Sequence, residues 1–464
     1  GKTMDEKKDT RQESDEERAR RLRRQRRIRQ EMRRRRRRRA LILRGVLAVA
    51  GILIVVLLIW GISALAGKIG GGEKKTADGE KTEQTGQTET AEEEELEEVA
   101  AEKVLHLSFG SLIADTEAAF GQEDRQAALS MDQGHLTVDE FNQVLQQLYD
   151  QGYILVGLHD LAAWDEESGQ MQAQTLRLPS GKKPLLLSQA NVNYDLSLTG
   201  QGCASAIVLD DSGKIQARLD KADGTSQTGD YDVIPCVDTF VEAHPDFSYN
   251  GARGVLSFSG YNGVLGYRTD ESLGSTENNK YASKYGVFDT ASETEAAKPV
   301  IEALRAEGWE FASGGYGNIS YAQDLETIQS DMELWQTRVK PLLGDVDILM
   351  FPEGTDIGDR KEYGEDNETD QYLKEQGFRY FCSRDLGEPF TQITGEYARS
   401  GYWNLDGYRM YQDLYQDAGR FSGILDFSQL YDPERPLVSD ESGAEEEAGT
   451  EEGTEASEEE TQAA

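Results

Sequence analysis

The stretch Lys183-Pro-Leu-Leu-Leu-Ser188 is a short apolar run, and the polar group Gln189-Ala-Asn-Val-Asn193 follows it directly. Short apolar runs of this length, bounded by polar residues, are typical of buried strands. In parallel α/β folds the ligands bind at the C-terminal ends of the strands. The stretch therefore predicts a buried parallel strand that delivers residues 189–193 to a binding site.

Strand and helix patterns alternate over residues 104–436, which predicts an α/β fold. The segment Thr137-Val-Asp-Glu140 is a capping box that predicts a helix to about Tyr149. We expect further strand ends to share one mouth with Gln189–Asn193, namely Ser313–Asn318, Pro352–Gly354 and Ser383–Asp385. The other expected elements are strands at 104–109, 153–158, 252–258, 309–312, 346–351 and 378–381, helices at 292–307, 324–343 and 371–377, and a β-hairpin insertion at 204–232.

Charge divides the chain into regions of opposite sign within a total of −37. Residues 1–44 carry a net +12, residues 68–103 a net −7 and residues 104–436 a net −31, while residues 437–464 hold eleven acids and no base. The region able to fold is strongly acidic and repels phosphate, so nucleic acid is not expected as a partner.

An uncharged apolar segment, residues 45–67, lies between the basic and the acidic regions. Its 23 residues suffice to cross a bilayer as a helix. The positive-inside rule places residues 1–44 in the cytoplasm and residues 68–464 outside, in a single-pass protein of the cell membrane. The arginine-rich tail is expected to contact anionic membrane lipid. Two alternatives stay open: cleavage of a signal peptide after Ala64-Leu-Ala66, and a nucleic-acid or ribosome contact of the arginines.

These observations predict five regions: a basic cytoplasmic tail (1–44), a transmembrane helix (45–67), a flexible acidic linker (68–103), a folded domain (104–436) and a disordered acidic tail (437–464). Within the linker, the residues near 92–101 are expected to be helical. The three cysteines are too few and too scattered for a disulfide framework or a zinc site, and are expected to be buried apolar residues.

The order of segments resembles the polysaccharide deacetylase (NodB-homology) family of carbohydrate esterases. The segments that carry the resemblance are Glu140–Tyr149 with Gly152-Tyr153, Lys183–Ser188, Gly260–Asp270, Ala306-Glu-Gly-Trp-Glu-Phe-Ala-Ser313 and Leu373-Lys-Glu-Gln-Gly-Phe378. The resemblance implies an irregular (β/α) barrel with seven or eight strands. It also implies removal of acetyl groups from glycans by a divalent metal held by one Asp and two His, with a second Asp as base and a later His as acid.

The residues that this chemistry requires are replaced in this chain. Ala190 stands at the base position and Asn191 at the position of the metal-binding Asp. Gly314 and Asn318 stand at the two histidine positions, and no histidine follows His244. An amide is a much weaker ligand than a carboxylate for a hard cation. We therefore expect no catalytic residue, no metal and no cofactor in this domain.

The mouth nevertheless has side chains suited to sugar recognition. The expected ligand-binding residues are Asn191, Asn193, Tyr261, Tyr316, Asn318, Glu353, Asp385 and Trp403. Tyr261 and Trp403 would stack on sugar rings, although aromatic residues more often serve core packing. The first hypothesis is thus an inactive, membrane-anchored deacetylase-like domain whose partner is cell-wall glycan or an envelope protein.

Two other hypotheses remain open. The chain is an active metal-dependent polysaccharide or peptidoglycan deacetylase with rearranged ligands, for which Glu353, Asp356, Asp359 and Asp385 are candidates. Alternatively, the cytoplasmic arginine segment performs the main function. Zinc analysis and acetate release test the former, and deletion of residues 1–39 tests the latter.

Overall fold

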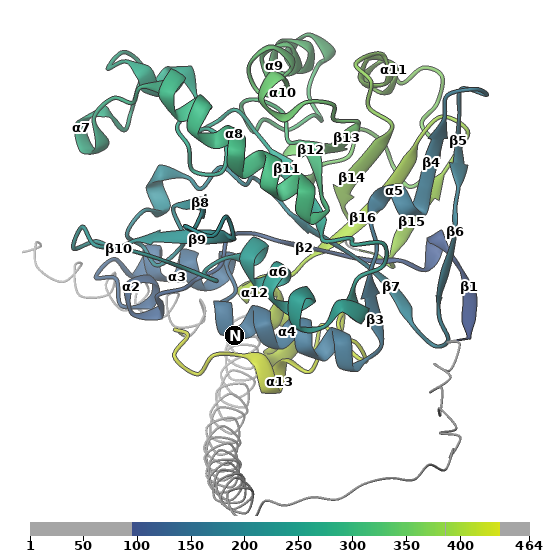
Figure 1. Ribbon diagram of the computed structural model, residues 1–464, viewed down its shortest axis with the longest axis horizontal. Coiled ribbons are helices and arrows are strands. Elements are labelled where there is room, and N and C mark those ends of the chain that lie inside the picture. The colour runs from purple at the N-terminus through teal and green to yellow at the C-terminus, as the bar shows by residue number, and fades with distance from the viewer. Residues whose placement is uncertain (1–94, 386, 437–464) are drawn as a thin grey trace, which may run out of the picture. The chain divides into compact units, whose positions relative to one another are not determined.

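A computed structural model describes residues 95–385 and 387–436 (Figure 1). The predicted basic tail, membrane helix and acidic tail lie outside these residues, as does most of the predicted linker. Within the described part of the chain, no helix has the length and hydrophobicity to cross a membrane.

Seven parallel strands form a closed barrel at the centre of the described domain. They are β2 (Leu105–Phe109), β7 (Lys183–Gln189), β11 (Gly254–Phe258), β12 (Trp309–Ser313), β13 (Ile348–Met350), β14 (Tyr380–Arg384) and β16 (Ala398–Asn404). The spatial order is β2-β7-β11-β12-β13-β14-β16, and the pairing of Trp403 with Leu107 joins β16 back to β2. The predicted (β/α) barrel is therefore the architecture that the structure has.

Strand β7 is the branching point of the sheet. Its beginning, from Lys183 to Leu185, pairs with β3 (Tyr153–Leu155), and its end, at Ser188 and Gln189, pairs with β11 on the same side. Its other edge pairs with β2 along its length. Because it is surrounded in this way, the apolar run that predicts a buried strand is fully buried from Pro184 onward.

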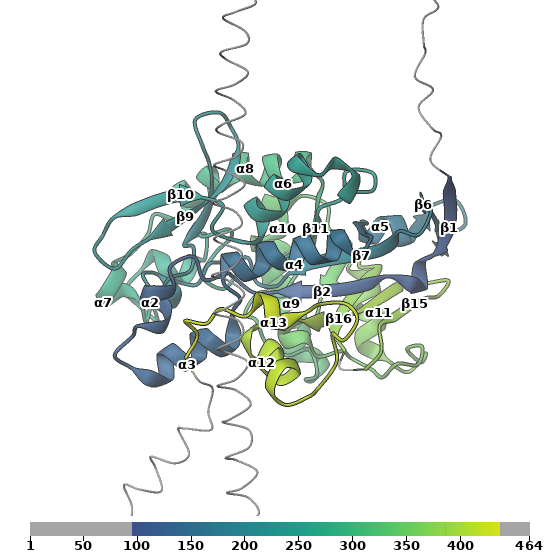
Figure 2. The ribbon, with the colours of Figure 1, turned by 90° about the horizontal axis from the view of Figure 1, so that it is seen from below.

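Helices follow the barrel strands and cover its outer face (Figures 1 and 2). The longer ones are α3 (Arg125–Gly134), α4 (Val138–Asp150), α6 (Val233–Ala243), α8 (Thr290–Glu307), α9 (Leu325–Arg338), α11 (Glu368–Glu375) and α12 (Gly407–Tyr415); the short ones are α2 (Thr116–Phe120), α5 (Leu158–Leu161), α7 (Ala282–Tyr285), α10 (Lys340–Leu343) and α13 (Phe427–Leu430). The capping box of α4 is confirmed, with Thr137 and Glu140 bonding reciprocally. The single helix expected over 324–343 is wrong: it is broken at Val339, just before Pro341.

The insertion differs from the expected hairpin. It is a three-stranded antiparallel sheet of β8 (Ala206–Leu209), β9 (Ile215–Asp220) and β10 (Ser226–Gly229). Its backbone meets the mouth through the bond from Ile207 N to Leu265 O. In Figures 1 and 2 this sheet lies on one side of the barrel, and the ribbon of β1 and β6 lies on the other.

Residues 95–103 correct the predicted linker boundary. β1 (Leu96–Ala100) pairs with β6 (Thr175–Pro179), and a 3-10 helix follows over Ala101–Lys103, so the expected helix near residues 92–101 is wrong. Ala101 and Leu178 belong to the same apolar cluster as Leu186 and Ile348 of the barrel strands. The ribbon, with β4 (Ala162–Asp165) and β5 (Gln170–Ala173), thus closes the N-terminal end of the barrel. The edge strand β15 (Phe390–Ile393) pairs with β16.

A buried ion cluster fastens the end of the described chain to the helices. The guanidinium of Arg435 donates to both carboxylate oxygens of Glu140, at 2.8 and 2.7 Å, and to Asp132 at 2.9 Å. All three side chains are buried. Removing one partner of such a buried cluster typically costs about 3–5 kcal/mol.

Candidate functional site

The C-terminal ends of β7 and β12 bring two asparagines together in the mouth. Asn191 Nδ2 donates to Asn318 Oδ1 at 3.0 Å, across 127 residues of sequence. Both residues have left-handed backbones, with φ of 51° and 54°, which asparagine tolerates better than most residues. The two motifs therefore meet in space, as their correspondence to the deacetylase metal motifs requires.

The residues present do not fit the divalent metal that the resemblance implies. Asn191 and Asn318 offer neutral amides, which are bonded to each other. At Gly314, a Cβ atom would stand 2.5 Å from Ser257 Oγ, so the serine occupies the space that a side chain needs. Among residues 95–385 and 387–436, no group of three or more His, Cys, Asp or Glu side chains is placed to hold a metal ion.

Asp331 of α9 holds the mouth loop that follows β12. Its carboxylate accepts from the backbone N–H groups of Tyr316 (2.9 Å) and Gly317 (2.7 Å) and from the Tyr321 hydroxyl (2.9 Å). Burial and the neighbouring carboxylate raise the pKa of Tyr321 well above its usual value, so the phenol stays a donor. Sequence analysis missed this residue, because its partners lie 10 to 15 positions away and no local pattern marks it.

Tyr261 and Tyr316 lie in adjoining loops, because the N–H groups of Gly260 and Tyr261 both donate to Tyr316 O. The Tyr316 ring covers Gly260, where a Cβ would come within 2.1 Å of it. Both rings are half-buried. Tyr261 also accepts a hydrogen bond from Lys280 at 2.8 Å, which together with the cation's attraction to the phenol raises the pKa of Lys280 to about 12.

The side chain of Asn193 supports the loop that carries Tyr261 and is only slightly exposed. Its side chain is 8% exposed and donates to Tyr261 O at 3.1 Å. Its own carbonyl accepts from the buried Arg268, which also bonds Asn262 O. Burial lowers the pKa of Arg268 to about 10, which still leaves it charged at neutral pH.

Two of the acids near the mouth are paired with arginines. Asp385 accepts from Arg360 at 2.8 and 3.0 Å, which, against the effect of burial, lowers the pKa of Asp385. Asp356 accepts from the buried Arg399 at 2.9 Å. These carboxylates are already neutralised, so they do not supply the rearranged metal ligands of the alternative hypothesis.

Glu353 differs from them. It is exposed, and it has a left-handed backbone with φ of 57° inside the 3-10 turn Pro352–Gly354 after β13. Glutamate has no local stabilisation in that conformation, in contrast to asparagine.

Trp403 lies in the core, away from the role expected of it. It is 7% exposed, packs edge-on against Phe421 at 5.5 Å and donates to Gly387 O at 2.9 Å. Its ring therefore offers little surface for stacking on a sugar.

His106 lies inside the barrel beneath the mouth. Its two ring nitrogens bond Ser188 Oγ and Ser400 Oγ, each at 2.9 Å. Burial lowers the pKa of His106 to about 3, so the ring is neutral. His106 is therefore a hydrogen-bonded core histidine of β2.

His159 lies near the closed, N-terminal end of the barrel, where it bridges Glu310 (2.5 Å) and Asp347 (3.0 Å). Burial alone would lower its pKa, but the hydrogen bonds and charges of the two carboxylates outweigh burial and raise the pKa of His159 to about 10.

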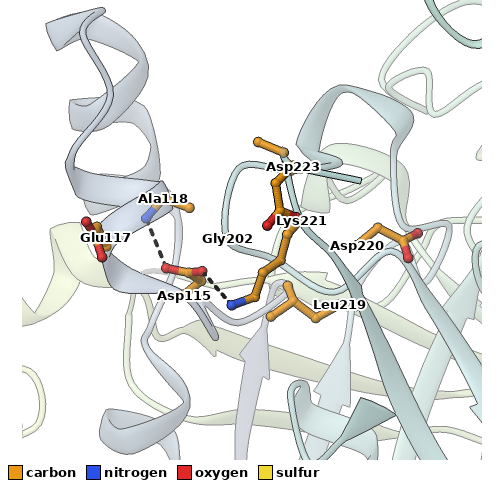
Figure 3. A pocket seen from close by; sticks show the side chains of 10 residues that line it. Asp115, Glu117, Ala118, Gly202, Leu219, Asp220, Lys221 and Asp223 are labelled. Carbon is orange, nitrogen blue, oxygen red and sulfur yellow. Dashed lines mark hydrogen bonds and ion pairs between the residues drawn. The ribbon is translucent and has the colours of Figure 1, made fainter. Parts of the chain in front are cut away.

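A hollow of about 410 Å³ lies between the start of α2 and the β9–β10 turn. Figure 3 shows Lys221 reaching across it to Asp115, at 3.6 Å. None of the predicted ligand-binding residues lines this hollow. The ion pair joins the insertion to the barrel side of the domain, which is a structural role.

No family model matches the chain, and no curated protein matches it in sequence. Among solved structures, a deacetylase of Streptococcus pyogenes in complex with acetate has 11% identity and a TM-score of 0.35, covering 69% of this chain and 98% of its own. A polysaccharide deacetylase of Bacillus cereus has 8% identity and a TM-score of 0.34, covering 69% of each chain. Both of these solved structures are deacetylases by name.

Proposed function

We propose that this chain is a membrane-anchored, deacetylase-like domain that has lost catalysis and binds envelope glycan at the barrel mouth. The single observation that carries the proposal is the hydrogen bond between Asn191 and Asn318. Because of this bond, two neutral amides stand at the ends of the two motifs and are hydrogen-bonded to each other. A hydrolytic site needs a Lewis acid and a proton acceptor at that place.

The filled space at Gly314 supports the loss of catalysis. A histidine there would collide with Ser257, so the site differs from a deacetylase site by more than its missing side chains. Ala190 has no group that can accept a proton.

The wall beside the asparagines supports glycan binding. Tyr261 and Tyr316 are half-buried, and their loops are fixed by backbone hydrogen bonds. Rigid aromatic side chains beside amides are suited to sugar rings, which present apolar faces and hydroxyl edges. The anchor at residues 45–67 remains a prediction from sequence.

The test combines metal analysis, acetate release and calorimetric titration of the purified chain with peptidoglycan fragments. We expect no stoichiometric zinc, cobalt or manganese, no acetate from acetylated oligosaccharides, and measurable heat with a glycan. Stoichiometric metal with acetate release would establish the active-deacetylase alternative instead. The absence of heat with any glycan would refute the binding role.

A further inference from the structure

The carboxylates around the mouth are unequally neutralised. Asp356 and Asp385 each bond an arginine, at 2.9 and 2.8 Å. Glu353 precedes both in the sequence and is exposed, and within residues 95–385 and 387–436 no ion pair joins it to a basic side chain. It is therefore a carboxylate of the mouth whose charge is available to a ligand.

The backbone conformation of Glu353 is strained. A non-glycine residue in the left-handed region is strained, and such residues occur preferentially at ligand-binding sites. Its neighbour Pro352 lies against the β12 loop, 3.0 Å from where a Cβ of Gly315 would stand. The turn after β13 is thus packed beside the loop that carries Tyr316 and Asn318.

A buried hydroxyl at the same end of the barrel has no partner. Ser259 directly follows β11 and precedes Gly260, on which the Tyr316 ring lies; its Oγ is buried and, among the described residues, forms no hydrogen bond. Buried polar groups are nearly always satisfied in native structures. Ser259 Oγ is therefore free to bond a polar group of a ligand that reaches it.

The net charge of the domain determines the sign of the ligand charge that it attracts. Residues 104–436 carry a net −31, which repels polyanions and attracts cations. Anionic wall polymers are thus disfavoured. A glycan whose sugars have free amines becomes a cation when those amines are protonated, and is favoured.

We propose that the mouth recognises amino sugars with free amines, and that the Glu353 carboxylate accepts the ammonium group. This inference rests on the proposed glycan-binding function and specifies its ligand: the deacetylated glycan rather than the acetylated one. Glu353 is then the residue that determines specificity. The tyrosines and the asparagine pair contact the ring and its hydroxyls, which both forms of the sugar share.

A basic residue, Arg384, lies beside this turn, and its Cβ is 2.8 Å from where a Cβ of Gly354 would stand. If its guanidinium turned toward Glu353, the carboxylate would no longer be available. The experiment therefore includes a variant at this position, Arg384→Gln, which should strengthen amine binding or leave it unchanged.

The experiment is a calorimetric titration of the full chain with glucosamine hexamer and with N-acetylglucosamine hexamer, at 50 and 300 mM salt. The variants are Glu353→Gln, Arg384→Gln and, as a matched control, Glu302→Gln on the exposed face of α8. Hexalysine serves as a cation without sugar rings. We expect the glucosamine hexamer to bind at least about tenfold more tightly than the acetylated one, an advantage that Glu353→Gln abolishes and Glu302→Gln preserves.

The outcomes distinguish failure of this inference from failure of the proposed glycan-binding function. Equal or tighter binding of the acetylated hexamer refutes the amine preference and leaves glycan binding intact. Binding of hexalysine as tight as that of glucosamine hexamer, or an amine preference that Glu353→Gln leaves unchanged, shows a general attraction to a polyanion and refutes the role of Glu353. If neither hexamer binds, both the inference and the proposed function fail.

Discussion

Replacing Asp331 tests whether the mouth loop depends on a single buried carboxylate. In Asp331→Ala, the N–H groups of Tyr316 and Gly317 and the hydroxyl of Tyr321 lose their acceptor. The two N–H groups are partly accessible to water, and we assign them about 1 kcal/mol each. The Tyr321 hydroxyl is buried, and its loss adds about 2 kcal/mol. Alanine is the better helix former, which returns about 0.5 kcal/mol.

The expected result is a loss of about 3.5 kcal/mol in the free energy of unfolding, measured by urea denaturation. The matched control is Glu333→Ala, an exposed position two residues along the same helix, where we expect a change within about 0.5 kcal/mol. Asp331→Asn retains one acceptor and should fall between the two. An Asp331→Ala variant as stable as the control would refute the claim that this carboxylate organises the loop.

Three further predictions concern two charged side chains and one close contact. His159→Gln removes a cation whose pKa is raised to about 10. Because the folded pKa exceeds the unfolded value of about 6.5, the stability lost on substitution should be greatest at pH 6 and shrink between pH 6.5 and 10. Denaturation curves of the variant and of the native chain, recorded at each pH, measure this loss. An equal loss at pH 6 and pH 10 would contradict the ion bridge. Arg435→Met leaves two carboxylates buried without their cation, so we expect a loss of about 3–5 kcal/mol; a loss below about 1 kcal/mol, measured in urea, would show that the cluster does not fasten the chain end. Gly314→Ala should be destabilised by about 1–3 kcal/mol, and adding Ser257→Ala should restore part of that loss in a double-mutant cycle; strict additivity would show that the two sites do not clash.

Sequence patterns predicted the α/β class because the strands are short apolar runs between helices, and the family resemblance implied the barrel. The run Lys183–Ser188 and the capping box at Thr137 are local signals, and both have the expected structure. The meeting of Asn191 and Asn318 was predictable as well, because strand ends in a parallel barrel converge.

What sequence patterns missed depends on distant partners. The glutamate-rich segment Leu96–Ala100 has no apolar alternation, and it is a strand because β6 lies beside it, about 80 residues later. The third strand of the insertion, Ser226–Gly229, is short and polar, and β9 determines its conformation. The sequence predicted that Trp403 stacks on a sugar ring. The fold shows instead that Phe421 packs against the Trp403 ring.

The seam between β16 and β2 joins residues nearly 300 positions apart, so the barrel cannot close until almost the whole domain has been synthesised. Until then, the strand edges of β2 and β14 and the apolar lining of the barrel have no partners. Pairings of such long range form slowly, and the incomplete sheet is prone to aggregate. A chain with this topology needs protection for β2 and the other early strands while β16 is still being synthesised. The buried ion cluster at Arg435 can form only after β16 is complete.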